Sequence, residues 1–187
     1  MTVMVVLAAA LLFAGGGCAS RDSDAGQPGE GGDGAKPDIS AKPAEIRQKV
    51  TLYFSKHFPD KNDEFLVPEE REVTKGDEPL EAVIVRELIK GRGKEGLSRT
   101  VPEGTRLLSV SVVDGVAYVN FSREFQNKHW GGTAGERMTI YSVVNSLCEL
   151  PGIDKVQFLL EGEKQESILG HMGTTVLIAP DRDLIAE

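Results

Sequence analysis

The chain has 187 residues, 40% of them hydrophobic, which is enough apolar material for one compact core. It carries 21 Lys and Arg residues against 29 Asp and Glu residues, for a net charge of -8. No basic run with interleaved aromatic residues is present, and a protein that follows nucleic-acid phosphates needs a basic surface. Nucleic acid is therefore excluded as an expected partner.

An apolar stretch opens the chain. Residues 3–13 carry only apolar side chains, and Ala14, three glycines and Cys18 follow them. This stretch is shorter than the ~20 apolar residues of a membrane-spanning helix, but it has the length of the hydrophobic region of a signal peptide. The run Leu-Phe-Ala-Gly-Gly-Gly-Cys18 resembles a bacterial lipobox, in which the cysteine receives diacylglycerol and becomes the new N-terminus.

We therefore expect residues 1–17 to be removed and Cys18 to be acylated. The lipid would hold the protein on the outer face of the bacterial cytoplasmic membrane. An ordinary cleaved signal and an uncleaved apolar anchor are the alternatives. If Cys18 is acylated, Cys148 has no intrachain partner, so no disulfide is expected and Cys148 is interpreted as a small buried hydrophobic residue.

Composition divides the rest of the chain. Residues 18–45 are rich in Gly, Asp, Ser, Pro and Lys and almost lack large apolar side chains, so they cannot offset the entropy of ordering. They are predicted to form a flexible tether. A single folded domain is predicted over residues 46–180, and residues 181–187 are predicted to be a C-terminal tail.

The first half of the domain shows strand and helix signals. Alternating apolar and polar residues at 50–55 predict a half-buried strand, and short strands are predicted at 65–67 and 72–74, around Pro68. Apolar residues then recur at helical spacing up to Gly91. Asp77 or Glu78 is expected to cap this helix, with a proline in its first turn.

The clearest local signal is a hairpin over residues 107–121. Two alternating runs flank Asp114-Gly115, a dipeptide typical of a two-residue turn with positive φ at both positions. The turn predicts one polar face, formed by Ser109, Ser111, Tyr118 and Asn120. It predicts an apolar face in which Val112 pairs with Ala117, Val110 with Val119, and Leu108 with Phe121.

A second helix is predicted from Thr133, whose hydroxyl would form a capping box with Glu136. Its apolar stripe ends at Cys148, Pro151 stops it, and a strand follows at 155–161. Two amphipathic helices among antiparallel strands predict an α+β fold. The expected architecture is a two-layer sandwich, with a mainly antiparallel sheet and both helices packed on one face.

Several segments in a fixed order carry a resemblance: Val50-Thr-Leu-Tyr-Phe-Ser, Leu66-Val-Pro-Glu, the hairpin at 107–121, Tyr141-Ser-Val-Val-Asn-Ser-Leu and Val156-Gln-Phe-Leu-Leu-Glu-Gly. Together they resemble the GerMN domain of sporulation and germination lipoproteins, over about residues 49–176. The resemblance implies an extracytoplasmic assembly module, similar to ring-building domains of secretion machines. Its partner would be an envelope protein or another copy of the chain.

Other motifs in the sequence bear on catalysis and cofactor binding. Residues 91–96 match the dinucleotide-binding pattern, but a helix precedes them where that site needs a strand, so we interpret them as a helix cap and a mobile loop. The histidines, His57, His129 and His171, lack the close spacing of zinc ligands. Ser122 and Ser142 lack the sharp Gly-x-Ser-x-Gly turn. No catalytic residue, cofactor or metal is expected.

Trp130, on a loop before two glycines, has two interpretations. It could stack on a sugar or fill a pocket of a partner. We favour a core plug beneath the start of the second helix, because residues of this size are generally well buried. The leading function is thus a membrane-anchored, non-enzymatic interaction domain; the alternatives are a peptidoglycan-binding module and, third, an unrecognised cell-wall hydrolase.

Overall fold

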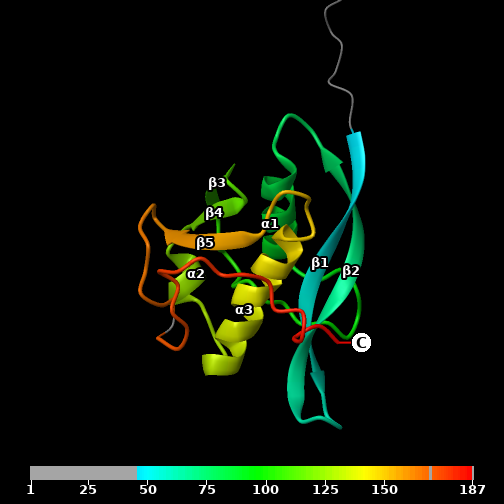
Figure 1. Ribbon diagram of the computed structural model, residues 1–187. Helices are drawn as coiled ribbons and strands as arrows, with labels where there is room; N and C mark the ends of the chain where they lie inside the picture. The colour runs from blue at the N-terminus through cyan, green and yellow to red at the C-terminus, as the bar shows by residue number, and fades with distance from the viewer. Residues whose placement is uncertain (1–45, 169, 187) are drawn as a thin grey trace, which may run out of the picture. The chain divides into compact units, whose positions relative to one another are not determined.

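Two β-sheets enclose a pair of helices in the computed structural model, which describes residues 46–168 and 170–186 (Figure 1). Cys18, the predicted signal peptide and the predicted tether lie outside these residues. The elements follow in the order β1 (Ile46–Phe58), β2 (Asp63–Lys75), α1 (Leu80–Lys90), β3 (Leu107–Val113), β4 (Val116–Phe121), α2 (Glu124–Asn127), α3 (Gly132–Leu147) and β5 (Lys155–Leu160).

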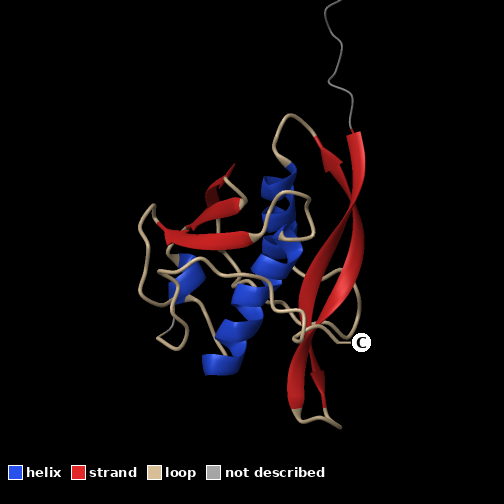
Figure 2. Cartoon of the chain, viewed as in Figure 1, coloured by secondary structure: helices blue, strands red, loops and turns tan. Residues whose placement is uncertain are grey.

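The α+β class is confirmed. Strands β3, β4 and β5 form one sheet in that order, with β3–β4 antiparallel and β4–β5 parallel, while β1 and β2 form a separate antiparallel hairpin. Helices α1 and α3 contact each other, and both also contact β1 on one side and the three-stranded sheet on the other. Figure 2 shows the helices between the two sheets. The hairpin β1–β2 thus adds a layer to the expected sandwich.

Strand β2 is one long strand, so the prediction of two short strands around Pro68 is wrong. Pro68 pairs with Tyr53, whose N–H bonds the Ser146 hydroxyl at 3.0 Å on the side away from β2. Tyr53 and Pro68 therefore form a non-hydrogen-bonded pair of the antiparallel ladder, in which the backbone N–H and C=O groups of both residues point away from the partner strand. The missing N–H of Pro68 therefore costs no bond between β1 and β2, and the strand continues through it.

The central hairpin forms as predicted around its turn, with Asp114 at φ 49° and Gly115 at φ 77°. The predicted pairs of Val112 with Ala117 and of Val110 with Val119 are present, and the predicted polar face is formed by Ser111 opposite Tyr118 and Ser109 opposite Asn120. The outer pair is wrong: a register irregularity between Leu107 and Ser109 places Leu107, not Leu108, opposite Phe121. Because of that irregularity Leu108 points out to solvent, and the expected continuous apolar face is broken at this end.

Both helices begin without a side-chain cap, contrary to the sequence predictions. The residue before α1 is Pro79, so neither Asp77 nor Glu78 caps it. The residue before α3 is Gly131, at φ 88°, which places Thr133 inside the helix rather than at its N-cap. Glu136 does not complete a capping box; it is buried, and its carboxylate accepts hydrogen bonds from the Ser167 hydroxyl and the His171 amide.

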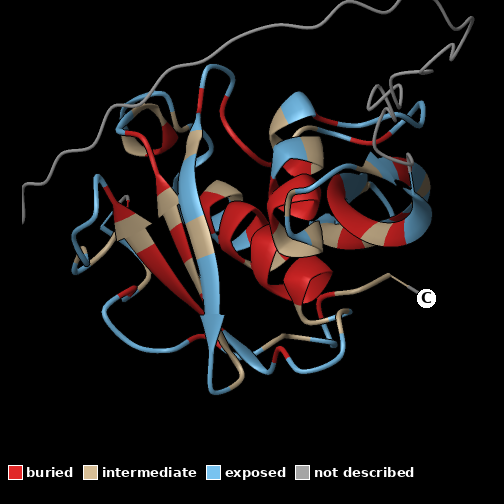
Figure 3. Cartoon of the chain, turned by 90° about the horizontal axis from the view of Figure 1, so that it is seen from above, coloured by how far each residue is buried: buried red, intermediate tan, exposed pale blue. Residues whose placement is uncertain are grey.

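The core lies between the helices and both sheets, where buried residues line the facing surfaces (Figure 3). Three phenylalanine rings stack at its centre: Phe125 lies 4.2 Å from Phe121 and 6.2 Å from Phe158, between centroids. Cys148, directly after α3, packs against this core and forms no disulfide. Burial raises the pKa of its thiol to about 11, as befits an inert, partly buried cysteine.

The last residues belong to the domain, so the predicted boundary at 180 falls too early. Leu66 donates its amide to the carbonyl of Leu184 at 2.8 Å and accepts the amide of Ala186 at 2.8 Å. The Leu184 side chain is 1% exposed and packs with Tyr53, Leu66 and Met138. The segment joins β2 through backbone hydrogen bonds. The charged residues around Leu184 gave no sign in the sequence that this segment pairs with a strand.

Within residues 46–168 and 170–186, no helix has both the length and the apolar character needed to cross a membrane.

Candidate functional site

Trp130 is 48% exposed, so its interpretation as a core plug is wrong. Gly131 and Gly132 both adopt positive φ and turn the chain into α3 immediately after Trp130. The Trp130 carbonyl lies so close to Gly135 that a Cβ there would meet it at 2.4 Å. These glycines hold the backbone in place while directing the indole outward rather than under the helix.

His129 supports the indole from one side. Its ring lies 5.7 Å from the Trp130 ring, and its Nε2 hydrogen-bonds the Thr139 hydroxyl at 2.8 Å. Burial disfavours the charged imidazole and lowers the pKa of His129. A neutral, anchored histidine therefore backs the exposed tryptophan.

A chain of buried hydroxyls fixes α3 to the strands and loops beneath this surface. Thr139 donates to the carbonyl of Thr100 at 2.6 Å, and the hydroxyls of Thr100 and Ser142 lie 2.7 Å apart. Ser142 also donates to the carbonyl of Tyr53 at 2.5 Å, and it is fully buried. Ser122 is likewise buried and accepts the amide of Arg106 at 3.0 Å. Both serines have structural partners.

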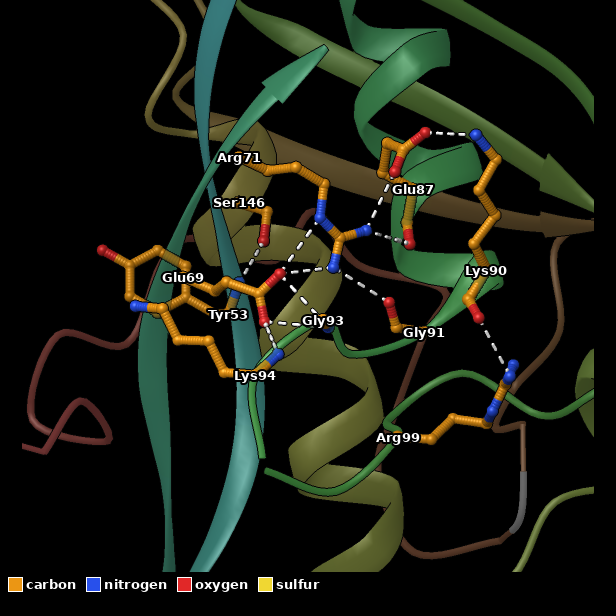
Figure 4. Close-up of polar contacts among 10 residues, drawn as sticks. All are labelled: Tyr53, Glu69, Arg71, Glu87, Lys90, Gly91, Gly93, Lys94, Arg99 and Ser146. Carbon is orange, nitrogen blue, oxygen red and sulfur yellow. Dashed lines mark hydrogen bonds and ion pairs between the residues drawn. The ribbon is translucent and has the colours of Figure 1, made fainter. Parts of the chain in front are cut away.

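The loop after α1 is held by an ionic network between β2 and α1 (Figure 4). Glu69 accepts the backbone amides of Gly93 at 3.0 Å and Lys94 at 2.9 Å, and it also binds Arg71. Arg71 reaches Glu87 at 2.8 Å and the carbonyl of Gly91 at 3.0 Å. This loop is therefore anchored, which corrects the prediction of a mobile loop; the helix cap at Gly91 is confirmed.

The charges in this network are mutually stabilised. Burial by itself raises the pKa of Glu69, but the hydrogen bonds from Arg71 and from the Lys94 and Gly93 amides outweigh it and hold that pKa below its ordinary value. Glu87 behaves in the same way, because Lys90 and Arg71 bind its carboxylate. Both carboxylates are therefore ionised at neutral pH.

The anchored loop brings Arg99 beside Trp130. Arg99 donates to the carbonyls of Ile89 at 2.6 Å and Lys90 at 3.0 Å, so its guanidinium caps the C-terminal end of α1. Arg99 and Trp130 both line each of three adjoining depressions, of about 600, 490 and 120 Å³. The charged side chains that line them are Lys90, Arg92, Arg99 and Lys128, against Glu64 and Glu103. We call this region the Trp130 surface.

Strand β3 offers a second exposed region. It is one of the two edge strands of its sheet in the described part of the chain, with β4 on its inner side and β5 at the other edge. Its apolar side chains Leu108, Val112 and Val113 are exposed, Val113 by 54%. A smaller exposed apolar pair, Val176 and Leu177, lies near the C-terminal segment.

No metal centre is formed by the residues that the structure describes, since no group of three or more His, Cys, Asp or Glu side chains converges there. His57 lies on β1, His129 before α3, and His171 in the segment after β5.

The described residues thus form an α+β domain with two exposed regions, and comparisons with known proteins identify its family. A model of the Germane family, described as sporulation and spore germination, matches residues 51–166. This match covers more than half of the chain, and the chain belongs to that family. No curated protein matches the chain.

Solved structures share the fold. The tandem GerMN domains of the sporulation protein GerM from Bacillus subtilis align with a TM-score of 0.60 and 21% identity, over 76% of this chain and 50% of that one. The first GerMN domain of the same protein aligns with a TM-score of 0.57 and 20% identity, over 73% of this chain and 98% of that one. A lipoprotein candidate from Clostridium perfringens aligns with a TM-score of 0.50 and 24% identity, over 71% of this chain and 87% of that one. This chain thus spans about half the length of the tandem structure.

Proposed function

We propose that this protein is a lipid-anchored, extracytoplasmic member of the Germane family that acts without catalysis. Its domain binds an envelope protein or a further copy of the chain, in sporulation or germination. Family membership supports the setting. The apolar run before Cys18 supports export and acylation.

The open edge of β3 is the observation that carries this proposal. Exposed strand edges bind further strands through their free backbone groups. In the other sheet each strand is bonded at one residue of its outer edge: Ser55 on β1 accepts the amide of Ser98 at 2.7 Å, and Leu66 on β2 bonds the C-terminal segment. Strand β3 has no bridge on its outer edge among the described residues, and it also carries exposed Val112 and Val113, so we infer that β3 is the contact strand.

A charge placed on β3 tests this contact. In cells that produce the full-length protein, a photo-crosslinking amino acid at Ser109 should yield a covalent adduct. Val112→Lys should reduce that adduct strongly, because a lysine on a sheet edge opposes further pairing. The matched control is Val176→Lys, at an exposed valine far from β3 in sequence. Equal adduct yields for the two variants would show that β3 is not the contact strand.

The anchor has its own test. Two acyl chains give durable membrane binding where one is marginal, so Cys18→Ser should move the protein from the membrane to the soluble fraction. It should also change the electrophoretic mobility. A Cys18→Ser protein that stays fully in the membrane fraction, with wild-type mobility, contradicts acylation at this residue.

A peptidoglycan-binding role is the second candidate, and the exposure of Trp130 favours it. An exposed indole offers a flat apolar face with a polar edge. The full-length protein should then sediment saturably with purified peptidoglycan, and Trp130→Ala should abolish that sedimentation. The third candidate, a cell-wall hydrolase, receives no support from Ser122 and Ser142, which are both buried.

A further inference from the structure

We infer that the Trp130 surface binds an anionic glycan. A sugar ring stacks on the indole of Trp130, and carboxylate or phosphate groups of the same polymer bind Arg92, Arg99 and Lys128, which line adjoining depressions. This inference rests on the second candidate function and assigns its ligand class.

The indole is a preorganised platform. Its backbone is fixed by the close contact between the Trp130 carbonyl and Gly135, and its flank is supported by the His129 ring at 5.7 Å. A rigid side chain loses little conformational entropy when a ligand binds. The exposed face of Trp130 therefore suits a flat, partly apolar ligand such as a sugar ring.

Positive charge is concentrated around the indole. Four basic side chains and two acidic ones line the three depressions, whereas the whole chain has a net charge of -8. Arg92 and Lys128 are exposed, and neither takes part in a salt bridge within the described residues. A locally basic surface on an acidic protein selects for an anionic ligand.

Arg99 supplies directed donors. A guanidinium has five N–H donors, and carbonyls at the end of α1 take two of them in Arg99. Those two bonds fix the orientation of the planar group beside Trp130. Its remaining donors can bind two oxygens of one carboxylate or phosphate. The indole of Trp130 and the guanidinium of Arg99 would thus hold the sugar ring and its anionic group side by side.

The shape of the site favours a glycan over single-stranded nucleic acid. Nucleic-acid grooves stack successive bases on several aromatic residues and follow a long basic track. Here one tryptophan stands alone, because it is the only one in the chain, and the overall charge is acidic. A single platform with a few cations beside it fits one ring and its charged substituent.

The test uses the full-length protein in detergent micelles, with purified cell-wall sacculi as the probe. The charge-reversal pair Arg92→Glu and Lys128→Glu should weaken sedimentation with sacculi at least tenfold. The matched control, Lys49→Glu with Lys164→Glu, makes the same change in net charge at exposed lysines elsewhere and should stay within twofold of wild type. Arg99 is not replaced, because it also caps α1.

Two further arms identify the anion. Sacculi treated with hydrofluoric acid lose phosphate-bearing polymers but keep the carboxylates of peptidoglycan. Retention of binding after treatment assigns the carboxylate of peptidoglycan. Loss of binding assigns the phosphate of another wall polymer; it supports the anionic ligand but contradicts the peptidoglycan role. Neutral N-acetylglucosamine oligomers should bind at least tenfold more weakly than soluble sacculus fragments, with quenching of Trp130 fluorescence as the readout.

Three results would overturn the inference: charge reversal at Arg92 and Lys128 without effect, neutral oligomers that bind as tightly as charged fragments, or polyglutamate that competes as well as the fragments do. The last would assign the surface to acidic peptides. If sacculi bind only through neutral sugar, the peptidoglycan role survives and the anionic assignment fails. Val112→Lys should leave sacculus binding unchanged, so this test is independent of the β3 contact.

Discussion

Glu69 caps the backbone of Lys94: its Oε2 accepts the Lys94 amide at 2.9 Å and thereby joins the middle of β2 to the loop that follows α1. The same oxygen accepts the Gly93 amide at 3.0 Å. The loop continues to Arg99, so a carboxylate on one sheet helps to position the guanidinium at the Trp130 surface.

Glu69→Gln should lower the free energy of unfolding by about 2 kcal/mol, because it weakens charge-assisted hydrogen bonds and leaves Arg71 without one of its two carboxylates. Chemical denaturation at neutral pH measures this loss. Glu70→Gln is the matched control: Glu70 is the next residue of β2 and is exposed, so its replacement should change little. Equal losses for the two variants would contradict a special role for Glu69.

Stability should fall in acid. The pKa values of Glu69 and Glu87 lie below the ordinary value of 4.5 in the folded protein, so the unfolded chain takes up protons first as the pH drops. Their contribution is fully present above about pH 4.5 and is lost as the pH falls through the lower, folded pKa values. Denaturation curves between pH 7 and pH 3 should show this decline, and Glu69→Gln should make it shallower. A wild-type slope in the variant would argue against the linkage.

Gly115→Ala should destabilise the protein by about 2 to 3 kcal/mol. Two effects add: positive φ opposes any side chain, and a Cβ at this position would lie 2.8 Å from the Asp154 carboxylate. Gly152→Ala isolates the first effect, since Gly152 has φ 85° but open space around it, and it should cost about 1 kcal/mol. Melting temperatures of both variants provide the comparison, and equal shifts would show that the Asp154 contact is easily relieved.

Leu184→Ala should cost about 2 kcal/mol or more, because it removes a fully buried side chain from the cluster with Tyr53, Leu66 and Met138. Leu177→Ala is the control, since that leucine is exposed. Thermal denaturation of the two variants distinguishes a packed C-terminal segment from a tail. Little change for Leu184→Ala would support the original boundary at 180.

Gly135→Ala should disturb Trp130, because the added Cβ would meet the Trp130 carbonyl at 2.4 Å. Alanine usually stabilises a helix relative to glycine, so a loss of about 1 to 3 kcal/mol would reveal the clash. The single tryptophan makes intrinsic fluorescence a direct reporter of the loop. Thr133→Ala should leave both stability and emission unchanged, as expected for a threonine that caps nothing.

Short-range signals in the sequence predicted much of the fold. The Asp114-Gly115 turn carries its own geometry, and alternation around it fixed the register as far as Ser109. The irregularity at Leu108 could not be predicted, because both Leu107 and Leu108 are apolar and only packing against Phe121 decides between them. Capping was predicted wrongly at Thr133 because the two preceding glycines enter the helix by a left-handed turn.

The candidate site was only partly predictable. The sequence marks Trp130 as a candidate contact residue, because it is an aromatic residue beside two glycines. Its exposure could not be predicted, because it depends on the contact between its carbonyl and Gly135 and on the path of the backbone into α3. The roles of Glu69 and Arg99 depend on partners that are distant in sequence or belong to the backbone, which no local pattern reveals. Residues 91–96, which match a nucleotide-binding motif in sequence, form the end of α1 and the start of a loop that Glu69 and Arg71 hold in place.

The bonds between Leu66 and the C-terminal segment also govern the order of folding. Contacts between residues far apart in sequence form slowly, because a long loop must close before they contribute stability. Ala186 reaches back to Leu66 across almost the whole domain. A growing chain therefore cannot bond Leu66 of β2 on its outer side until residues 184–186 have been synthesised, and a product that stops before them leaves Leu66 open to strand pairing and to proteases.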